Sequence, residues 1–241
     1  MRLSNATAVM RWVGDRHLLL SWAERGAGGD ADPLDDPTVQ VRHATRMLGA
    51  RTPEGLVDFA PAETTILLTF DGTTLVPQRA EEHVRAVLAM LADDAAPDVG
   101  RLVEIPVCYA ATCAPDIGDV ARRCAMSEQQ VADLHCGAEY TVRFLGFAPG
   151  FGYLAGLPKV LATPRLESPR TSVPAGSVGI ADDRTGVYPL AMPGGWRLIG
   201  RTPLRLFDAG REPPATLRAG DRVRFTPITE AQFCQMMKGR Q

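Results

Sequence analysis

The chain has 241 residues, a formal net charge of −2 and a hydrophobic fraction of 45%, which together are typical of a folded globular protein with one large or two ordinary domains. The near-neutral charge gives no electrostatic reason to expect a nucleic acid or an anionic membrane as a partner. No apolar run approaches the ~20 residues of a membrane helix, and the first residues lack the apolar core of a signal peptide, so we expect neither.

The first 95 residues alternate between strand and helix patterns. Gly14-Asp15 separates two β-like runs and predicts a hairpin, and 24–36 reads as a polar loop. Asp36 before Pro37 predicts a helix start, and Gly49 predicts its end. Further runs predict strands at 6–12, 17–22, 56–60 and 64–70 and an amphipathic helix at 79–92. This ββαββα order predicts a small α+β domain over residues 1–95, with helices on one face of an antiparallel sheet.

Residues 93–100 are polar and contain Pro and Gly, which is typical of a linker between domains. The patterns that follow predict a strand at 102–109, helices at 115–124 and 127–136, and a strand at 139–145. Ser127 with Gln130 and Thr229 with Gln232 match capping boxes, in which two side chains satisfy free backbone donors at a helix start. The second box predicts a short helix near the end of the chain.

The composition changes between 137 and 220, where Gly and Pro are concentrated. Short β runs lie between the turns, at 178–181, 196–199, 204–207 and 222–225. Glycine and proline restrict the backbone to turns of defined shape, so 144–207 is expected to form rigid loops of the kind that carry binding sites. The pattern predicts a barrel or another compact β-fold.

The motifs of several enzyme classes are missing from the sequence. There is no P-loop and no His-Glu-x-x-His motif. The segment 146–152, Gly-Phe-Ala-Pro-Gly-Phe-Gly, resembles a nucleotide-binding glycine loop, but its proline and aromatics do not open a helix. Gly176-Ser177-Val178-Gly179 is not the Gly-x-Ser-x-Gly turn of a hydrolase.

Two polar residues are candidates for catalytic chemistry. His135, which precedes the strand leading to the glycine loop, is either a structural histidine or a catalytic base. Ser177 beside Gly176 presents its hydroxyl and nearby N–H groups to an anion or carbonyl, or else is an ordinary turn residue.

Two arginines and two aromatic residues are candidates for binding a small molecule. Arg165 and Arg170, each after a proline, are suited to grip a carboxylate or phosphate. Tyr153 and Trp196 form either a pocket wall or part of the core.

The other histidines and the cysteines are assigned no chemistry. His17, His43 and His83 lie among polar neighbours and are expected on the surface. The five cysteines show neither zinc spacing nor a Cys-x-x-Cys pair, so we expect packing residues, no metal and a reduced cytoplasmic protein.

Ordered motifs from about 105 to 228 resemble the KipI family, which includes the B-type subunit of bacterial ATP-dependent 5-oxoprolinase and is often labelled allophanate hydrolase subunit 1. They are also similar to one half of the carboxyltransferase domain of urea carboxylase. The matching segments are Leu134-His135, 146–154, Pro164-Arg165, Pro169-Arg170, 173–178, 185–189, 193–196, 199–203, Phe207-Asp208 and 220–225. The chain departs from the family in 110–116, Ala-Ala-Thr-Cys-Ala-Pro-Asp, where a Gly-rich acidic segment is frequent.

The resemblance implies an α+β fold: a small amino-terminal α+β domain, then a cyclophilin-like β-barrel domain over 102–241. It implies cytoplasmic cleavage of 5-oxo-L-proline to L-glutamate, coupled to ATP hydrolysis, with a second barrel subunit that resembles the C-type subunit of 5-oxoprolinase. ATP binds either to that partner or to a site shared with it. The rivals are a KipI-like inhibitor of a sensor histidine kinase and a carboxyltransferase subunit of urea or allophanate metabolism; the absence of biotin regions weakens the latter.

The implied reaction needs an arginine for the substrate carboxylate, donors for a developing oxyanion and a base for water. We assign these roles to Arg170 or Arg165, to the Gly176-Ser177 backbone with the Ser177 hydroxyl, and to His135. Phe147 and Phe151 are expected at the partner interface, since exposed aromatics often mark interfaces, with filling of the barrel as the alternative. The isolated chain is therefore expected to be inactive.

Overall fold

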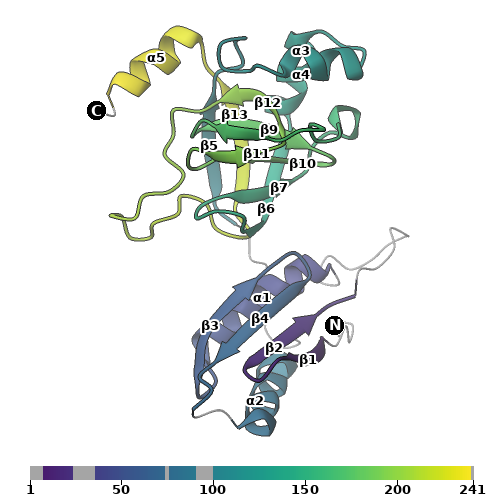
Figure 1. Ribbon diagram of the computed structural model, residues 1–241, viewed down its shortest axis with the longest axis vertical. Helices are drawn as coiled ribbons and strands as arrows, with labels where there is room; N and C mark the ends of the chain where they lie inside the picture. Colours follow the sequence, from purple (N-terminus) through teal and green to yellow (C-terminus); the bar gives the residue numbers. More distant parts are fainter. Residues whose placement is uncertain (1–7, 24–35, 74–75, 91–99, 240–241) are drawn as a thin grey trace. The chain divides into compact units, whose positions relative to one another are not determined.

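The structure is a computed structural model that describes residues 8–23, 36–73, 76–90 and 100–239. The chain folds into two compact units, Met1–Asp98 and Val99–Gln241 (Figure 1). The predicted linker at 93–100 and loop at 24–36 lie almost entirely outside the described residues. Within the described ranges, no helix combines the length and the apolar character needed to cross a membrane.

The described part of the first unit forms a four-stranded antiparallel sheet in the order β1-β2-β4-β3. Its strands are β1 (Val9–Val13), β2 (His17–Ser21), β3 (Leu56–Pro61) and β4 (Thr65–Phe70). Alternate residues of β2 and β4, such as Leu18 and Leu68, are buried, which is the period-two pattern of a sheet covered on one face.

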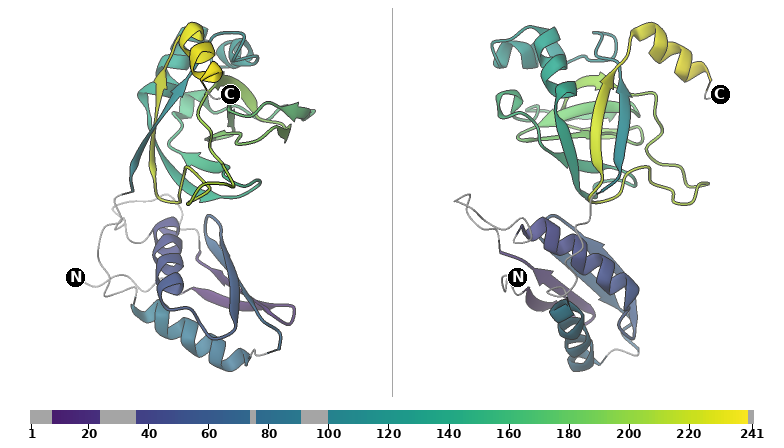
Figure 2. Two further views of the ribbon diagram at one scale, coloured as in Figure 1. Left: turned by 90° about the vertical axis from the view of Figure 1, so that its left-hand side faces the viewer. Right: turned by 180° about the vertical axis from the view of Figure 1, so that it is seen from behind.

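Two helices, α1 (Pro37–Ala50) and α2 (Pro77–Ala89), cover that face (Figure 2). The predicted start of α1 is confirmed, because the Asp36 side chain accepts a hydrogen bond from the N–H of Thr38. Gly49 lies inside α1 and does not end it. The expectation that His43 is a surface group is wrong, since this side chain is buried on the core face of α1.

Within residues 100–239, seven strands form a nearly closed barrel in the order β12-β9-β10-β7-β6-β13-β5. Their bounds are β5 (Leu102–Val107), β6 (Glu139–Leu145), β7 (Gly152–Ala155), β9 (Ser177–Ala181), β10 (Arg184–Val187), β12 (Arg197–Arg201) and β13 (Arg222–Pro227). β13 lies between β6 and β5, parallel to β5 (Figure 2). Two backbone hydrogen bonds, of 2.8 and 2.9 Å between Cys108 and Arg201, join the two ends of the sheet. The predicted barrel is therefore confirmed.

Three helices accompany the barrel: α3 (Ile117–Arg123), α4 (Glu128–Gly137) and α5 (Glu230–Lys238). Both predicted capping boxes are present, at Ser127 and Thr229. α3 and α4 lie side by side at one end of the unit (Figure 1). A short 3-10 turn, η3 (Lys159–Leu161), follows β7.

A small sheet of β8 (Arg170–Val173) and β11 (Met192–Gly194) adds a second layer to the barrel. Val178 and Ile180 of β9 point into the main core, whereas Ala181 belongs to a separate apolar cluster with Val173 of β8 and Leu198. Successive strand residues face opposite sides, so this second cluster lies on the outer face of the barrel wall. Strands β7, β8, β10 and β11 were not predicted, and the strand predicted at 204–207 is absent from the described structure.

Candidate functional site

An aromatic cluster forms the centre of the small outer core. Phe151 is 1% exposed and makes edge-to-face contacts with Tyr153, Tyr188 and Trp196, with ring centroids 5.0–5.4 Å apart. Such contacts stabilise a packed core beyond the burial of apolar area. Placing Phe151 at a partner interface is therefore wrong, because its ring is the hub of this core. Tyr153 remains half-buried at the edge of the cluster.

The glycine loop between β6 and β7 folds back on itself. The N–H groups of Gly146, Ala148 and Phe151 all bind carbonyl groups of the same loop, at 2.8–3.1 Å. Gly150 has φ of +81°, and a Cβ atom there would lie 2.8 Å from the Cβ of Phe207, so the loop packs directly against that residue. These three N–H groups are therefore not free to bind a phosphate.

Phe147 is the exposed residue of this loop. Its side chain is 61% exposed, although its ring also makes an edge-to-face contact with Phe151, with the ring centroids 5.5 Å apart. Its φ of +69° lies in the left-handed region, which is costly for a bulky residue. The backbone thus holds a large aromatic ring towards solvent in a strained conformation, as is frequent at functional sites.

Arg170, at the start of β8, is held by a buried carboxylate. Its Nη2 lies 2.7 Å from Oδ1 of Asp116, and its side chain is 31% exposed. Its Nη1 is buried and has no hydrogen-bond partner among the described residues. A buried donor without a partner is rare in proteins and commonly marks a place for a ligand or water. Arg170 therefore has one nitrogen anchored and one buried nitrogen without a hydrogen-bond partner among the described residues.

Tyr188 is a buried member of the outer aromatic core, beside the predicted binding residue Trp196. Burial raises the pKa of Tyr188, a backbone hydrogen bond with Trp196 and the positive charges of Arg165 and Arg170 oppose this rise, and Tyr153 adds to it. The backbone geometry brings the predicted binding residues into one region. The rings of Tyr153 and Trp196 are in contact, with centroids 5.8 Å apart, and Arg170 pairs with Gly194, two residues before Trp196. Arg165 is the most exposed of the four, and its Nε lies 3.7 Å from Oδ2 of Asp182.

His135 lies elsewhere, inside the main barrel core. It is fully buried, its ring stacks on Phe225 with a centroid distance of 4.5 Å, and both ring nitrogens are within hydrogen-bond distance of Tyr109 or Thr185. Burial lowers its pKa from 6.5 to about 3. A base must be accessible to the group that it deprotonates, and this ring is fully buried with both nitrogens engaged, so the geometry favours the structural alternative for His135.

The Gly176-Ser177 segment is also engaged by the fold. The N–H of Gly176 binds the carbonyl of Tyr188 at 2.7 Å, and the N–H of Ser177 binds that of Pro174 at 3.2 Å. A Cβ atom at Gly176 would lie 2.3 Å from the carbonyl oxygen of Thr202. Because both N–H groups are occupied, the segment does not form the predicted oxyanion site, and Ser177 itself is buried.

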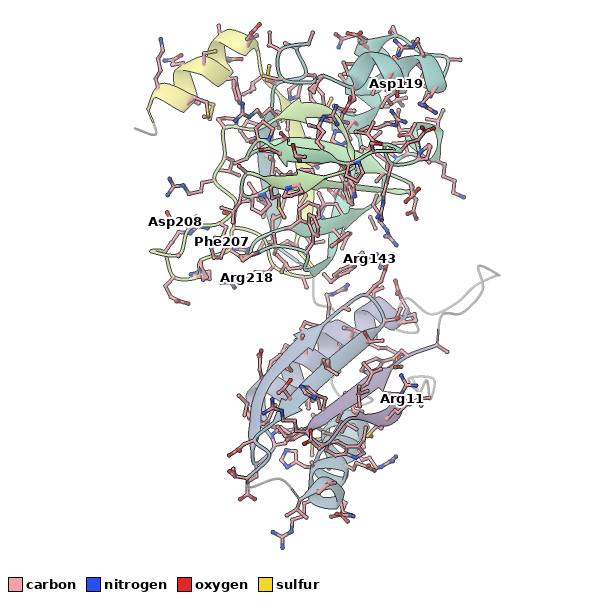
Figure 3. All side chains as sticks on the ribbon, viewed as in Figure 1. Arg11, Asp119, Arg143, Phe207, Asp208 and Arg218 are labelled. Atoms are coloured by element: carbon pink, nitrogen blue, oxygen red, sulfur yellow. The ribbon has the colours of Figure 1, made fainter. Side chains whose placement is uncertain are left out.

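Sequence reasoning missed Asp116, the anchor of Arg170. A signal was present, because Pro115 followed by Asp116 at the start of the predicted helix 115–124 is typical of a helix N-terminus. Asp119, within α3 (Figure 3), carries three ion pairs, with Arg122, Arg123 and Arg197. No group of three or more His, Cys, Asp or Glu side chains among the described residues is arranged to hold a metal.

The barrel, its outer aromatic core and the preceding α+β unit define the class of this protein. Residues 8–217 match the family model described as carboxyltransferase domain, subdomain C and D. A curated relative from Bacillus subtilis, named as the B-type subunit of 5-oxoprolinase, is 44% identical over 92% of this chain and 93% of its own length. The chain therefore belongs to the carboxyltransferase C/D family that contains the B-type subunits of 5-oxoprolinase.

Solved structures agree with this assignment. The crystal structure of TTHA0988 has a TM-score of 0.75 and is 34% identical over 88% of this chain, which corresponds to 40% of the solved chain. Urea carboxylase from Kluyveromyces lactis superposes with a TM-score of 0.71 over 99% of this chain and 24% of its own, at 19% identity. The second likeness establishes the fold alone.

Proposed function

We propose that this protein is the B-type subunit of an ATP-dependent 5-oxoprolinase, which cleaves 5-oxo-L-proline to L-glutamate together with a second barrel subunit. The name of the Bacillus subtilis relative, which aligns over nearly the whole chain, supports the substrate and the subunit role. The buried guanidinium nitrogen Nη1 of Arg170, which has no hydrogen-bond partner among the described residues, carries the proposal on the structural side. The substrate is a five-membered lactam with a carboxylate, and this nitrogen offers a buried donor for that carboxylate.

The proposed reaction has a defined balance of atoms. The terminal phosphoryl group of ATP is transferred to the oxygen of the lactam carbonyl. A first water adds to the carbonyl carbon, and the C–N bond breaks as the nitrogen takes up a proton, which leaves an acyl phosphate. A second water hydrolyses this acyl phosphate, so that the products are L-glutamate, ADP, phosphate and a proton. ATP acts here as a substrate that makes a stable amide reactive. The role of this chain is to bind and orient the lactam beside Arg170 and the half-buried Tyr153.

Two segments of this chain are candidates for binding a phosphate of the nucleotide, and both use N–H groups within the fold. These are the N–H groups of Gly146, Ala148 and Phe151 in the glycine loop and those of Gly176 and Ser177. We therefore place ATP and the groups that activate water on the partner subunit, with the reaction at the shared boundary. The exposed, strained Phe147 is the proposed anchor for that partner, because a fixed aromatic ring is the kind of residue that dominates protein interfaces. The isolated chain is then inactive.

The test is ATP-dependent glutamate release from 5-oxo-L-proline by this chain copurified with its partner. Arg170→Met is expected to raise KM for 5-oxo-L-proline by roughly 10- to 100-fold, the value of a charge-assisted hydrogen bond. Arg122→Met, which removes an exposed arginine of α3, is the control and leaves KM unchanged. Full activity of the single chain would contradict the shared site. A copurified but inactive complex would favour the kinase-inhibitor alternative.

A further inference from the structure

Asp116 occupies the N-cap position of α3 and yet does not cap this helix. Its side chain makes no hydrogen bond to the first turn, although aspartate is among the best residues for that purpose. The carboxylate turns instead to two other elements. Oδ1 accepts from Nη2 of Arg170 and Oδ2 accepts from the N–H of Leu198, both at 2.7 Å. The Asp116 carboxylate thus links α3 to β8 and β12 and does not cap the helix. This arrangement indicates a role for Asp116 other than stabilising α3.

The Asp116 link determines where Arg170 points. Asp116 is buried and both of its oxygens are engaged, so it has little freedom to move. A guanidinium group is planar, and its nitrogens lie in a fixed fork. Holding Nη2 against Asp116 therefore fixes the direction of the buried Nη1, which lacks a partner among the described residues. Asp119, which pairs with other arginines, has no such link to Arg170.

We infer that Asp116 is a positioning residue that aims Nη1 of Arg170 at the carboxylate of the substrate. The pair thereby selects cyclic amides that carry a carboxylate over neutral cyclic amides. This inference rests on the proposed function. It has an electrostatic rival, in which Asp116 only neutralises the charge of Arg170. The two explanations predict opposite effects of removing the Asp116 charge. If Asp116 orients Arg170, its loss weakens carboxylate binding; if Asp116 only neutralises Arg170, its loss strengthens carboxylate binding.

Asp116→Asn is the informative variant for the complex. Asparagine keeps an oxygen for the N–H of Leu198 but offers Arg170 an amide that has lost the negative charge. We expect kcat/KM for 5-oxo-L-proline to fall roughly 10- to 100-fold, mainly through KM. The inhibition constant of 2-pyrrolidinone, a lactam without a carboxylate, should stay within about twofold of wild type, since a local effect on carboxylate binding does not reach it. Asp119→Asn is the matched control and leaves both constants unchanged.

The double variant Asp116→Asn/Arg170→Met tests the mechanism even if the single variant does not fold, because it removes both charges. Asp116 acts through Arg170, so the double variant should have the same KM as Arg170→Met. A higher KM in the double variant, an unchanged or lowered KM in Asp116→Asn, or an equal effect on 2-pyrrolidinone overturns the inference. If Arg170→Met itself leaves KM unchanged, the carboxylate role of Arg170 in the proposed function has failed, and the inference fails with it.

Discussion

The hydroxyl oxygen of Tyr109 lies 2.8 Å from Nδ1 of His135 and donates its proton to that nitrogen. The direction follows from the other side of the ring. Thr185 donates its hydroxyl proton to the carbonyl of Gly179, so its oxygen accepts the proton carried by Nε2 of His135, at 3.0 Å. A neutral histidine thus links α4 to β10 through the core, and every polar atom in the chain of bonds has a partner.

Replacing His135 should therefore lower the stability of the protein, as expected for a structural residue of the core. In His135→Ala, a cavity remains and the bonds from Tyr109 and to Thr185 are lost inside the core. We expect the free energy of unfolding to fall by roughly 3 kcal/mol or more, measured by urea titration. His83→Ala, at an exposed histidine, is the control and should change little. A variant with unchanged stability but lost turnover in the complex would restore the catalytic interpretation.

The same histidine predicts a dependence of stability on pH. Its pKa is about 3 in the folded protein and about 6.5 when exposed, so the unfolded chain binds one proton more between these values. The contribution of neutral His135 to the free energy of unfolding is therefore fully present above pH 6.5. It falls as the pH drops below this value, by about 2 kcal/mol between pH 6.5 and 4.5. Urea titrations at several pH values test this. His135→Gln, which does not titrate there, should show a flatter profile, and an equally steep one would refute the assignment.

Phe147 and Phe151 provide a matched pair of substitutions four residues apart. Phe151→Asp places a charge in the centre of the aromatic core and should lower stability by more than about 4 kcal/mol, because the aromatic rings around it cannot solvate a charge. Phe147→Asp changes an exposed ring and should leave the melting temperature nearly unchanged while copurification with the partner is lost. Thermal melting and copurification of both variants distinguish a core residue from an interface residue. Normal partner binding by Phe147→Asp would remove Phe147 from the interface.

Limited proteolysis should cut first between 93 and 101, and release a stable fragment that begins near residue 102. The composition of this segment motivates the prediction, and the large apolar core of the second unit supports the survival of the fragment. Mass spectrometry of the fragments gives the cleavage sites. Early cuts within 144–207 would show that these loops are not rigid.

Local sequence signals predicted those elements whose determinants are local. The caps at Asp36, Ser127 and Thr229 are formed by residues within three positions of one another, and all three were confirmed. The amphipathic helices and the alternating strands of the first unit were confirmed for the same reason. By contrast, short strands such as β8 and β11 were missed, because each is held by a strand about twenty residues away and has almost no pattern of its own.

The candidate site divides in the same way. The sequence by itself determined the residue types, the concentration of turns in 144–207 and the family, since ordered motifs can be read without coordinates. Whether a side chain is buried depends on contacts from distant strands, so only the tertiary structure decided that Phe151 is core and Phe147 exposed, and that His135 lies in the barrel. Only the tertiary structure likewise decided that Asp116 contacts Arg170, which lies 54 residues further along the chain. No local pattern encodes that contact, because the fold of the barrel and the small outer sheet creates it.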